Sequence, residues 1–237
     1  MSKKRIFSVV MVFSLVVVLS FAAAAKLVDG IYSLRGKEDD HGNYPSITIE
    51  VKNGVLAKVD YKEMVVADNA PKAKGKYPHD AYFTAVETLN KKAVEVNGDL
   101  TKLDAVAGAT HTSETMKEML FWAMTKAAKL PDRTYPAIET AADARGYKAK
   151  LVVTVKDGKV ANIEYYEYNV DGNKPKTKGE YKWDAYFEAC EALPQRVLKE
   201  GGTLVGVDGY AGATLTSTNF FALYRRFWDI MLPQAMK

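Results

Sequence analysis

One ten-residue pattern occurs twice in this chain and constrains its fold more than any other feature. The copies read DAVAGATHTS at residues 104–113 and DGYAGATLTS at residues 208–217, so they lie 104 positions apart. In each copy, small residues surround one threonine, Thr110 or Thr214. This composition indicates a backbone loop pressed against something bulky, with a hydroxyl presented to it. The duplication predicts two such sites.

The repeat extends well beyond the motif. Aligning residues 46–113 with residues 150–217 without a gap gives 29 identities in 68 positions, and similarity at a fixed offset indicates duplicated architecture. Preserved packing explains identities such as Ala85 and Leu89. It explains Asp104, Thr110, Thr112 and Ser113 poorly, because polar loop residues are seldom needed to fill a core.

The N-terminal segment predicts export. Basic residues at 3–5 precede an uncharged apolar run at 6–21, and alanines at 23–25 end the run before Lys26; this is the pattern of a signal peptide. An uncut segment of this length would also reach across a bilayer. We therefore expect residues 1–25 to be a signal peptide or a membrane anchor, and the rest of the chain to lie outside the cytoplasm, secreted, periplasmic or anchored.

Charge and cysteine content exclude several classes of function. Of the 33 basic residues, three belong to the N-terminal segment, which leaves 30 basic against 29 acidic residues. Since no basic stripe remains, we expect no nucleic-acid partner. The single cysteine, Cys190, excludes an intramolecular disulfide and a thiolate metal cluster, and we interpret it as a small buried hydrophobe.

Each repeat opens with the pattern of a β-hairpin. Apolar and polar residues alternate on both sides of Asn53-Gly54 and of Asp157-Gly158, which are strong signals for two-residue turns. Lysine-rich stretches at residues 72–76 and 174–178 follow. We interpret these stretches as solvated loops.

Two helices complete each repeat in this prediction. Apolar spacing predicts the first helix at residues 80–94 and 184–199. The second should follow the motif, at residues 113–129 and 217–231, with its Thr-Ser pair as N-cap. At 237 residues the chain can form two modest domains, which we expect at 26–131 and 132–237. The predicted fold class is α+β, with two tandem copies of a small, mainly antiparallel sheet and packed helices.

The motif has the properties of a phosphate site. A loop of small residues that leads into a helix presents unpaired backbone N–H groups at a positively polarised helix end. Gly108 and Ala109 would permit close approach, and Thr110 would offer its hydroxyl. Thr112 and Ser113 would cap the helix or donate to phosphate oxygens, while Asp104 would orient the turn or face a metal-bound donor.

The motif resembles the flavinylation motif of the FMN-binding domain family, which occurs in the covalent-flavin subunits of sodium-pumping NADH:quinone reductase and the related Rnf complex, and in exported bacterial flavoproteins. In that family the threonine after Gly-Ala is esterified to the phosphate of FMN. A magnesium-dependent flavin transferase makes this bond outside the cytoplasm and takes the FMN from FAD.

The resemblance implies two covalent FMN groups, one on Thr110 and one on Thr214. The other cofactor-binding positions that it implies are Asp104, Ala107, Gly108, Ala109, Thr112 and Ser113 in the first copy, and Asp208, Ala211, Gly212, Ala213, Thr216 and Ser217 in the second. The chain departs from the family at Ala107 and Ala211, where many members have serine or threonine.

The resemblance implies an electron carrier that relays electrons from a membrane donor to an acceptor outside the cytoplasm, with a flavin transferase as its maturation partner. It assigns no catalytic residue and no metal ligand. Two alternatives stay open, an FMN-dependent reductase of a small molecule and a non-catalytic exported scaffold. No G-x-G-x-x-G sequence opens a βαβ unit to support a dinucleotide enzyme.

The three histidines differ between the repeats. His41, His79 and His111 correspond to Arg145, Trp183 and Leu215, so a metal site shared by both repeats is not expected. His111 and Leu215 directly follow the two motif threonines, and an imidazole beside one flavin alone would make the two flavin environments unequal. Matched aromatics, which are Tyr77, Tyr82, Phe83, Tyr181, Tyr186 and Phe187, are expected to be mainly core residues.

Overall fold

The computed structural model describes residues 25–171 and 173–232. The predicted signal peptide or anchor lies outside the described residues, apart from Ala25. Within the described part of the chain, no helix combines the length and apolar character that crossing a membrane requires.

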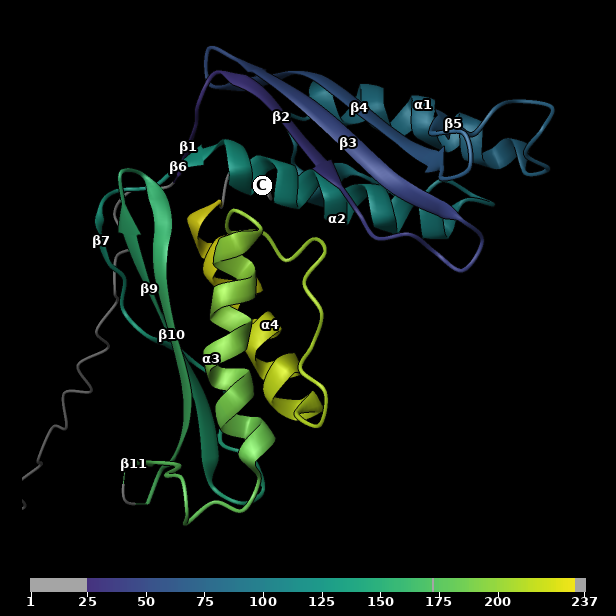
Figure 1. Ribbon diagram of the computed structural model, residues 1–237. Helices are drawn as coiled ribbons and strands as arrows, with labels where there is room; N and C mark the ends of the chain where they lie inside the picture. Colours follow the sequence, from purple (N-terminus) through teal and green to yellow (C-terminus); the bar gives the residue numbers. More distant parts are fainter. Residues whose placement is uncertain (1–24, 172, 233–237) are drawn as a thin grey trace, which may run out of the picture.

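The first half is a four-stranded antiparallel sheet with two helices packed against it (Figure 1). The sheet order is β2-β3-β4-β5, in which β3 and β4 form the predicted hairpin. Helix α1 packs on β4, and helix α2 packs on β2 and β3. The bounds are β2 Gly30–Arg35, β3 Asn43–Lys52, β4 Val55–Val65, β5 Ala70–Pro71, α1 Asp80–Glu95, the short 3-10 helix η1 Leu100–Lys102 and α2 Thr110–Ala127.

The second half repeats this arrangement. Its sheet has the order β11-β10-β9-β7, with β8 also paired to β9, and Figure 1 shows helices α3 and α4 side by side on one face of it. Helix α3 packs on β10, and helix α4 packs on β8 and β9. The bounds are β7 Arg133–Thr134, β8 Ile138–Glu139, β9 Tyr147–Lys156, β10 Lys159–Asn169, β11 Lys174–Pro175, α3 Asp184–Lys199 and α4 Thr214–Met231.

Core packing joins the two halves, and a two-stranded sheet links the start and the end of the first half. Strand β1 (Lys26–Leu27) pairs antiparallel with β6 (Ala128–Lys129), which directly follows α2. Trp122 of α2 stacks on Tyr224 of α4 with ring centroids 6.1 Å apart, and buried side chains of both halves belong to one hydrophobic cluster. The α+β fold class predicted from the sequence is confirmed.

Both predicted hairpin turns are present and are fixed by an aspartate. Asn53 and Gly54 have positive φ values of 53° and 74°, as the favoured two-residue turn requires. Their backbone N–H groups both donate to the Asp29 carboxylate at 2.9 Å. Asp132 accepts the same pair of bonds from the turn at Asp157-Gly158.

The predicted helix starts in the motif are wrong by three residues. Helices α2 and α4 begin at Thr110 and Thr214, and not at Ser113 and Ser217. The predicted Thr-Ser N-caps are therefore incorrect, because the chain already enters helical geometry after the glycine of each motif, and the N-cap residues are Ala109 and Ala213. The predictions for α1 and α3 agree with the structure to within one residue.

Candidate cofactor-binding sites

Each motif loop is pressed against the first turn of the preceding helix. Gly108 has a φ of +76° and Gly212 has a φ of +78°, a region that side-chain-bearing residues rarely adopt. A Cβ atom on Gly108 would lie 3.3 Å from the Cβ of Ala81, and one on Gly212 would lie 3.3 Å from the Cβ of Ala185. The close backbone approach expected from the small residues is therefore made, and its partner is a neighbouring helix.

A buried serine hydroxyl fixes each loop from within. Ser113 Oγ accepts a hydrogen bond from the Val106 N–H at 3.0 Å and donates one to the Ala109 carbonyl at 2.9 Å. Ser217 makes the corresponding bonds to Tyr210 and Ala213 at 2.8 and 2.9 Å. Because both hydroxyls are buried and engaged, they hold the loop in shape.

The two motif threonines occupy the first position of their helices and are exposed. The N–H groups of a first helical turn have no partner within the helix. The N-cap residues Ala109 and Ala213 have methyl side chains, which cannot accept a hydrogen bond. Each threonine hydroxyl therefore lies at a helix end that favours an anion such as a phosphate.

Thr110 lines a cleft of 880 Å³ between the motif, the segment 37–45 and the start of α1. This volume lies within the range of about 300–1,000 Å³ that is usual for small-molecule and cofactor sites. The walls include Lys72, Tyr77 and Tyr82, which offer a cation and aromatic faces. A planar cofactor tethered at Thr110 fits these dimensions and this chemistry.

A buried ion pair lies at the wall of this cleft. Lys72 pairs with Glu63, and their side chains are only 5% and 11% exposed. Glu63 also accepts from Thr112 Oγ1 at 3.4 Å, and the Lys72 ammonium lies 4.1 Å from the centre of the Tyr77 ring. The interpretation of residues 72–76 as a solvated loop is therefore wrong for Lys72, because the carboxylate draws its ammonium inward.

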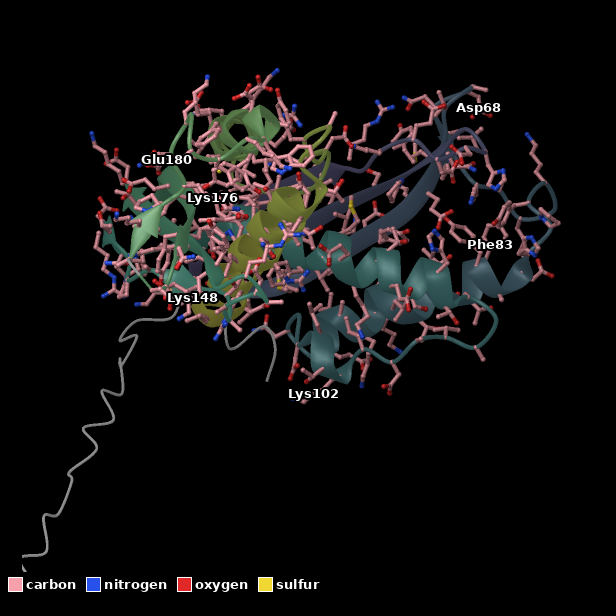
Figure 2. The ribbon with its side chains drawn as sticks, turned by 90° about the horizontal axis from the view of Figure 1, so that it is seen from below. Asp68, Phe83, Lys102, Lys148, Lys176 and Glu180 are labelled. Carbon is pink, nitrogen blue, oxygen red and sulfur yellow. The ribbon has the colours of Figure 1, made fainter. Side chains whose placement is uncertain are left out.

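A corresponding ion pair lies in the second half. Lys176 pairs with Glu167, with side chains 7% and 5% exposed, and its ammonium lies 4.2 Å from the centre of the Tyr181 ring. Tyr165 donates to Glu167 at 3.1 Å and to the Thr216 carbonyl at 3.2 Å. Figure 2 shows Lys176 well apart from Phe83, which packs on Tyr77 and Tyr82 at the first site. The two candidate sites are therefore separate.

Sequence reasoning missed these ion pairs, although the sequence contained a signal for them. Glu63 and Lys72 recur at the 104-residue offset as Glu167 and Lys176. Glu63 also continues the alternation of inward positions along β4, after Val59 and Tyr61. A charged residue at an inward strand position needs a buried partner, and the lysine repeated at the same offset provides it.

Burial raises the pKa of several groups in these networks. It raises the pKa of Tyr82 to about 12 and that of Tyr61 further. The thiol of Cys190 lies beside Tyr186, and burial raises its pKa to about 12. Cys190 is half-buried and packs against the hydrophobic core, so it is less buried than the sequence predicted.

The two motif aspartates have different surroundings. Asp104 and Asp208 are both exposed, but Asp208 forms an ion pair with Lys37 of the first half, which lowers the pKa of the Asp208 carboxyl. Arg196 of α3 donates to the carbonyls of Asp208 and Gly209 at 2.9 and 3.1 Å. The remaining motif residues, Ala107 and Ala211, are exposed on the loop.

Comparison with known proteins identifies part of the chain. A family model for the FMN-binding domain matches residues 146–228, so this region, which contains the second motif, is an FMN-binding domain. No curated protein matches the chain. A crystal structure of a protein from Clostridium perfringens is 26% identical over 43% of this chain and 88% of its own, with a TM-score of 0.38. A solution NMR structure of a Clostridium thermocellum protein is 22% identical over 44% of this chain and 94% of its own, with a TM-score of 0.33.

Proposed function

We propose that this protein is an electron carrier outside the cytoplasm that holds two FMN groups, each joined through its phosphate to Thr110 or Thr214. The observation that carries the proposal is the position shared by the two threonines. Each is the exposed first residue of a helix, and the N-cap alanine before it follows a glycine with positive φ. The FMN-binding domain at residues 146–228 supplies the cofactor's identity for the second site, and the repeated motif extends it to the first.

Attachment uses the exposed threonine hydroxyl. The oxygen of Thr110 or Thr214 forms a bond to the FMN phosphorus of FAD, the hydroxyl proton is lost, and AMP leaves. A flavin transferase supplied by the cell would perform this step. The first-turn N–H groups of α2 and α4 would then hydrogen-bond the phosphate oxygens, since a helix N-terminus favours negative charge.

The protein's part in the redox reaction is to position the flavin and set its surroundings. Bound FMN accepts and donates electrons one or two at a time. Lys72, Tyr77 and Tyr82 line the first cleft, and their counterparts Lys176, Tyr181 and Tyr186 form the same group of contacts in the second half. Covalent attachment suits an exported carrier, because a dissociated flavin would be lost by dilution.

A reductive titration tests the carrier function. The flavinylated protein should take up two electrons per FMN from a small reductant and return them to an artificial acceptor, in the absence of a specific substrate. Each of Thr110→Ala and Thr214→Ala should halve the electron uptake. An uptake that neither variant changes would contradict the proposal.

The reductase alternative makes a different prediction. A reductase binds its substrate through protein contacts. Free FMN at the same concentration would therefore not support reduction of that substrate. The presence of two separate candidate sites favours the carrier, since a reductase needs only one substrate-binding flavin.

A further inference from the structure

Two positions beside the candidate sites carry different side chains in the two halves. His79 and His111 line the cleft that contains Thr110. His79 is the N-cap residue of α1, and His111 is the second residue of α2. The matched residues are Trp183, the N-cap of α3, and Leu215, the second residue of α4. Two imidazoles therefore flank the first site, whereas an indole and an aliphatic side chain occupy the same positions in the second.

The backbone at these positions is nearly the same in both halves. His79 has φ −108° and ψ 94°, and Trp183 has φ −105° and ψ 96°. The motif loop touches the first turn of the preceding helix at the same 3.3 Å distance in each half. Trp183 and Leu215 therefore stand at the starts of α3 and α4, the two helix ends that adjoin the second motif loop.

Both apolar side chains at the second site are largely exposed. Trp183 is 56% exposed and Leu215 is 64% exposed. Single exposed apolar residues are common on protein surfaces. A pair that flanks an anion-binding helix end is more specific, because it offers a ligand an apolar surface next to a phosphate site. Trp122 and Trp228, by contrast, are 1% and 3% exposed within the core.

We propose that Trp183 and Leu215 hold the isoalloxazine ring of the FMN on Thr214, with the ring stacked on the Trp183 indole. This inference rests on the proposed function, because it requires FMN at Thr214. A flat aromatic ring suits an indole face in an offset stack, and Leu215 covers the ring from the adjacent position of α4. The two flavins are then inequivalent.

Stacking on an indole has an optical consequence. An excited flavin takes an electron from a stacked indole and returns it without emitting light, so its fluorescence is quenched. Tyr77 and Tyr82 near the first site match Tyr181 and Tyr186 near the second, whereas Tyr210 of the second motif corresponds to Val106 of the first. We therefore expect the FMN on Thr214 to be the dimmer of the two, and a substitution of Trp183 within the second site isolates the part of the quenching that the indole causes.

The test uses single-flavin forms of the full chain, produced with an active flavin transferase. Thr110→Ala keeps only the second site, and Thr214→Ala keeps only the first. In the Thr110→Ala background, Trp183→His should raise the FMN fluorescence yield severalfold. In the Thr214→Ala background, the converse change His79→Trp should lower it severalfold. Trp228→Phe, which removes a core tryptophan, is the control and should leave the yield unchanged.

The outcomes separate the inference from the proposed function. An intact mass without FMN on the Thr110→Ala form would overturn both. The second outcome is that the mass shows FMN on the Thr110→Ala protein, but adding Trp183→His leaves its fluorescence unchanged. That outcome would overturn only the inference. A circular dichroism spectrum shows whether each variant is folded, and Trp183 is exposed enough for its replacement to leave the core intact. Brighter flavin in the folded Trp183→His variant supports the stack.

Discussion

The Ser113 hydroxyl donates a hydrogen bond to the Ala109 carbonyl at 2.9 Å and thereby ties the first turn of α2 to the loop before it. The same hydroxyl accepts from the Val106 N–H on the other side of the loop. Thr110 lies between these contacts, so its position at the helix start depends on a buried side chain three residues later. Ser217 holds Thr214 in the same way.

Replacing this serine should therefore destabilise the loop. Ser113→Ala leaves the Val106 N–H without its acceptor, and we expect a loss of about 1–3 kcal/mol in the free energy of unfolding, measured by urea denaturation. Thr218→Ala is the control, because Thr218 is exposed and donates only to the Thr214 carbonyl; it should change stability by less than about 0.5 kcal/mol. Equal losses in both variants would contradict the role of Ser113.

The motif glycine should be more sensitive to substitution than a glycine in an open turn. Gly108 and Gly75 both have positive φ, +76° and +84°, but only the Gly108 position crowds a neighbour, Ala81. Gly108→Ala and Gly75→Ala should each lose about 1–2 kcal/mol through the left-handed backbone, and Gly108→Ala should lose more through the contact. Thermal unfolding compares the two, and a greater loss at Gly75 would argue against close packing at the motif.

Breaking the buried ion pair should have a large effect. Lys72→Met leaves the Glu63 carboxylate buried without its cation, and we expect a loss of about 3–5 kcal/mol in unfolding free energy. The double variant Lys72→Met/Glu63→Gln should recover part of it. The control is the exposed pair Lys92–Glu95, whose side chains are each 48% exposed. Lys92→Met should cost no more than about 1 kcal/mol.

The ion pair between Lys37 and Asp208, which joins the two halves, should affect the pKa of the Asp208 carboxyl. A hydrogen bond and the charge of Lys37 hold the pKa of the Asp208 carboxyl below its ordinary value, so Lys37→Met should raise that pKa, as measured by carbon NMR of the carboxyl. A group with a lowered native pKa contributes stability above its unfolded pKa and loses it as pH falls through the native pKa. Lys37→Met should therefore flatten this part of the pH–stability curve.

Asp132 provides the internal control for this titration. Its pKa is lowered mainly by the backbone N–H groups of Gly158 and Asp157, which Lys37→Met does not touch. A shift of both aspartates would point to a general change in the protein. An unchanged Asp208 would mean that the ion pair does not form in solution.

The sequence predicted most of the regular structure because its signals were local. Asn53-Gly54 requires a turn with positive φ, and the apolar spacing in residues 80–94 and 184–199 fixes two helices. The start of α2 was missed because Thr112 and Ser113 match the N-cap preference, although their hydroxyls serve other contacts. N-cap preferences alone do not show that the chain enters the helix at Thr110, directly after Gly108 and Ala109.

Contacts between distant segments were harder to predict. The burial of Lys72 depends on Glu63, nine residues away on β4, and a lysine-rich stretch gives no local sign of it. The Lys37–Asp208 pair joins segments 171 positions apart, and Lys37 lies outside the gapless repeat, so no internal comparison reveals it. The repeat alignment alone predicted that His111 and Leu215 differ beside the two motif threonines. The exposure of Trp183 at the start of α3 could be seen only in the structure.

The most direct test of the central claim is the intact mass of the exported protein after co-expression with a flavin transferase. We predict two FMN additions in the unaltered chain, one in Thr110→Ala, one in Thr214→Ala and none in the double variant. Peptide mapping should locate each addition on the threonine that remains. A chain without added mass, produced beside a control substrate that the same transferase does modify, would contradict the account.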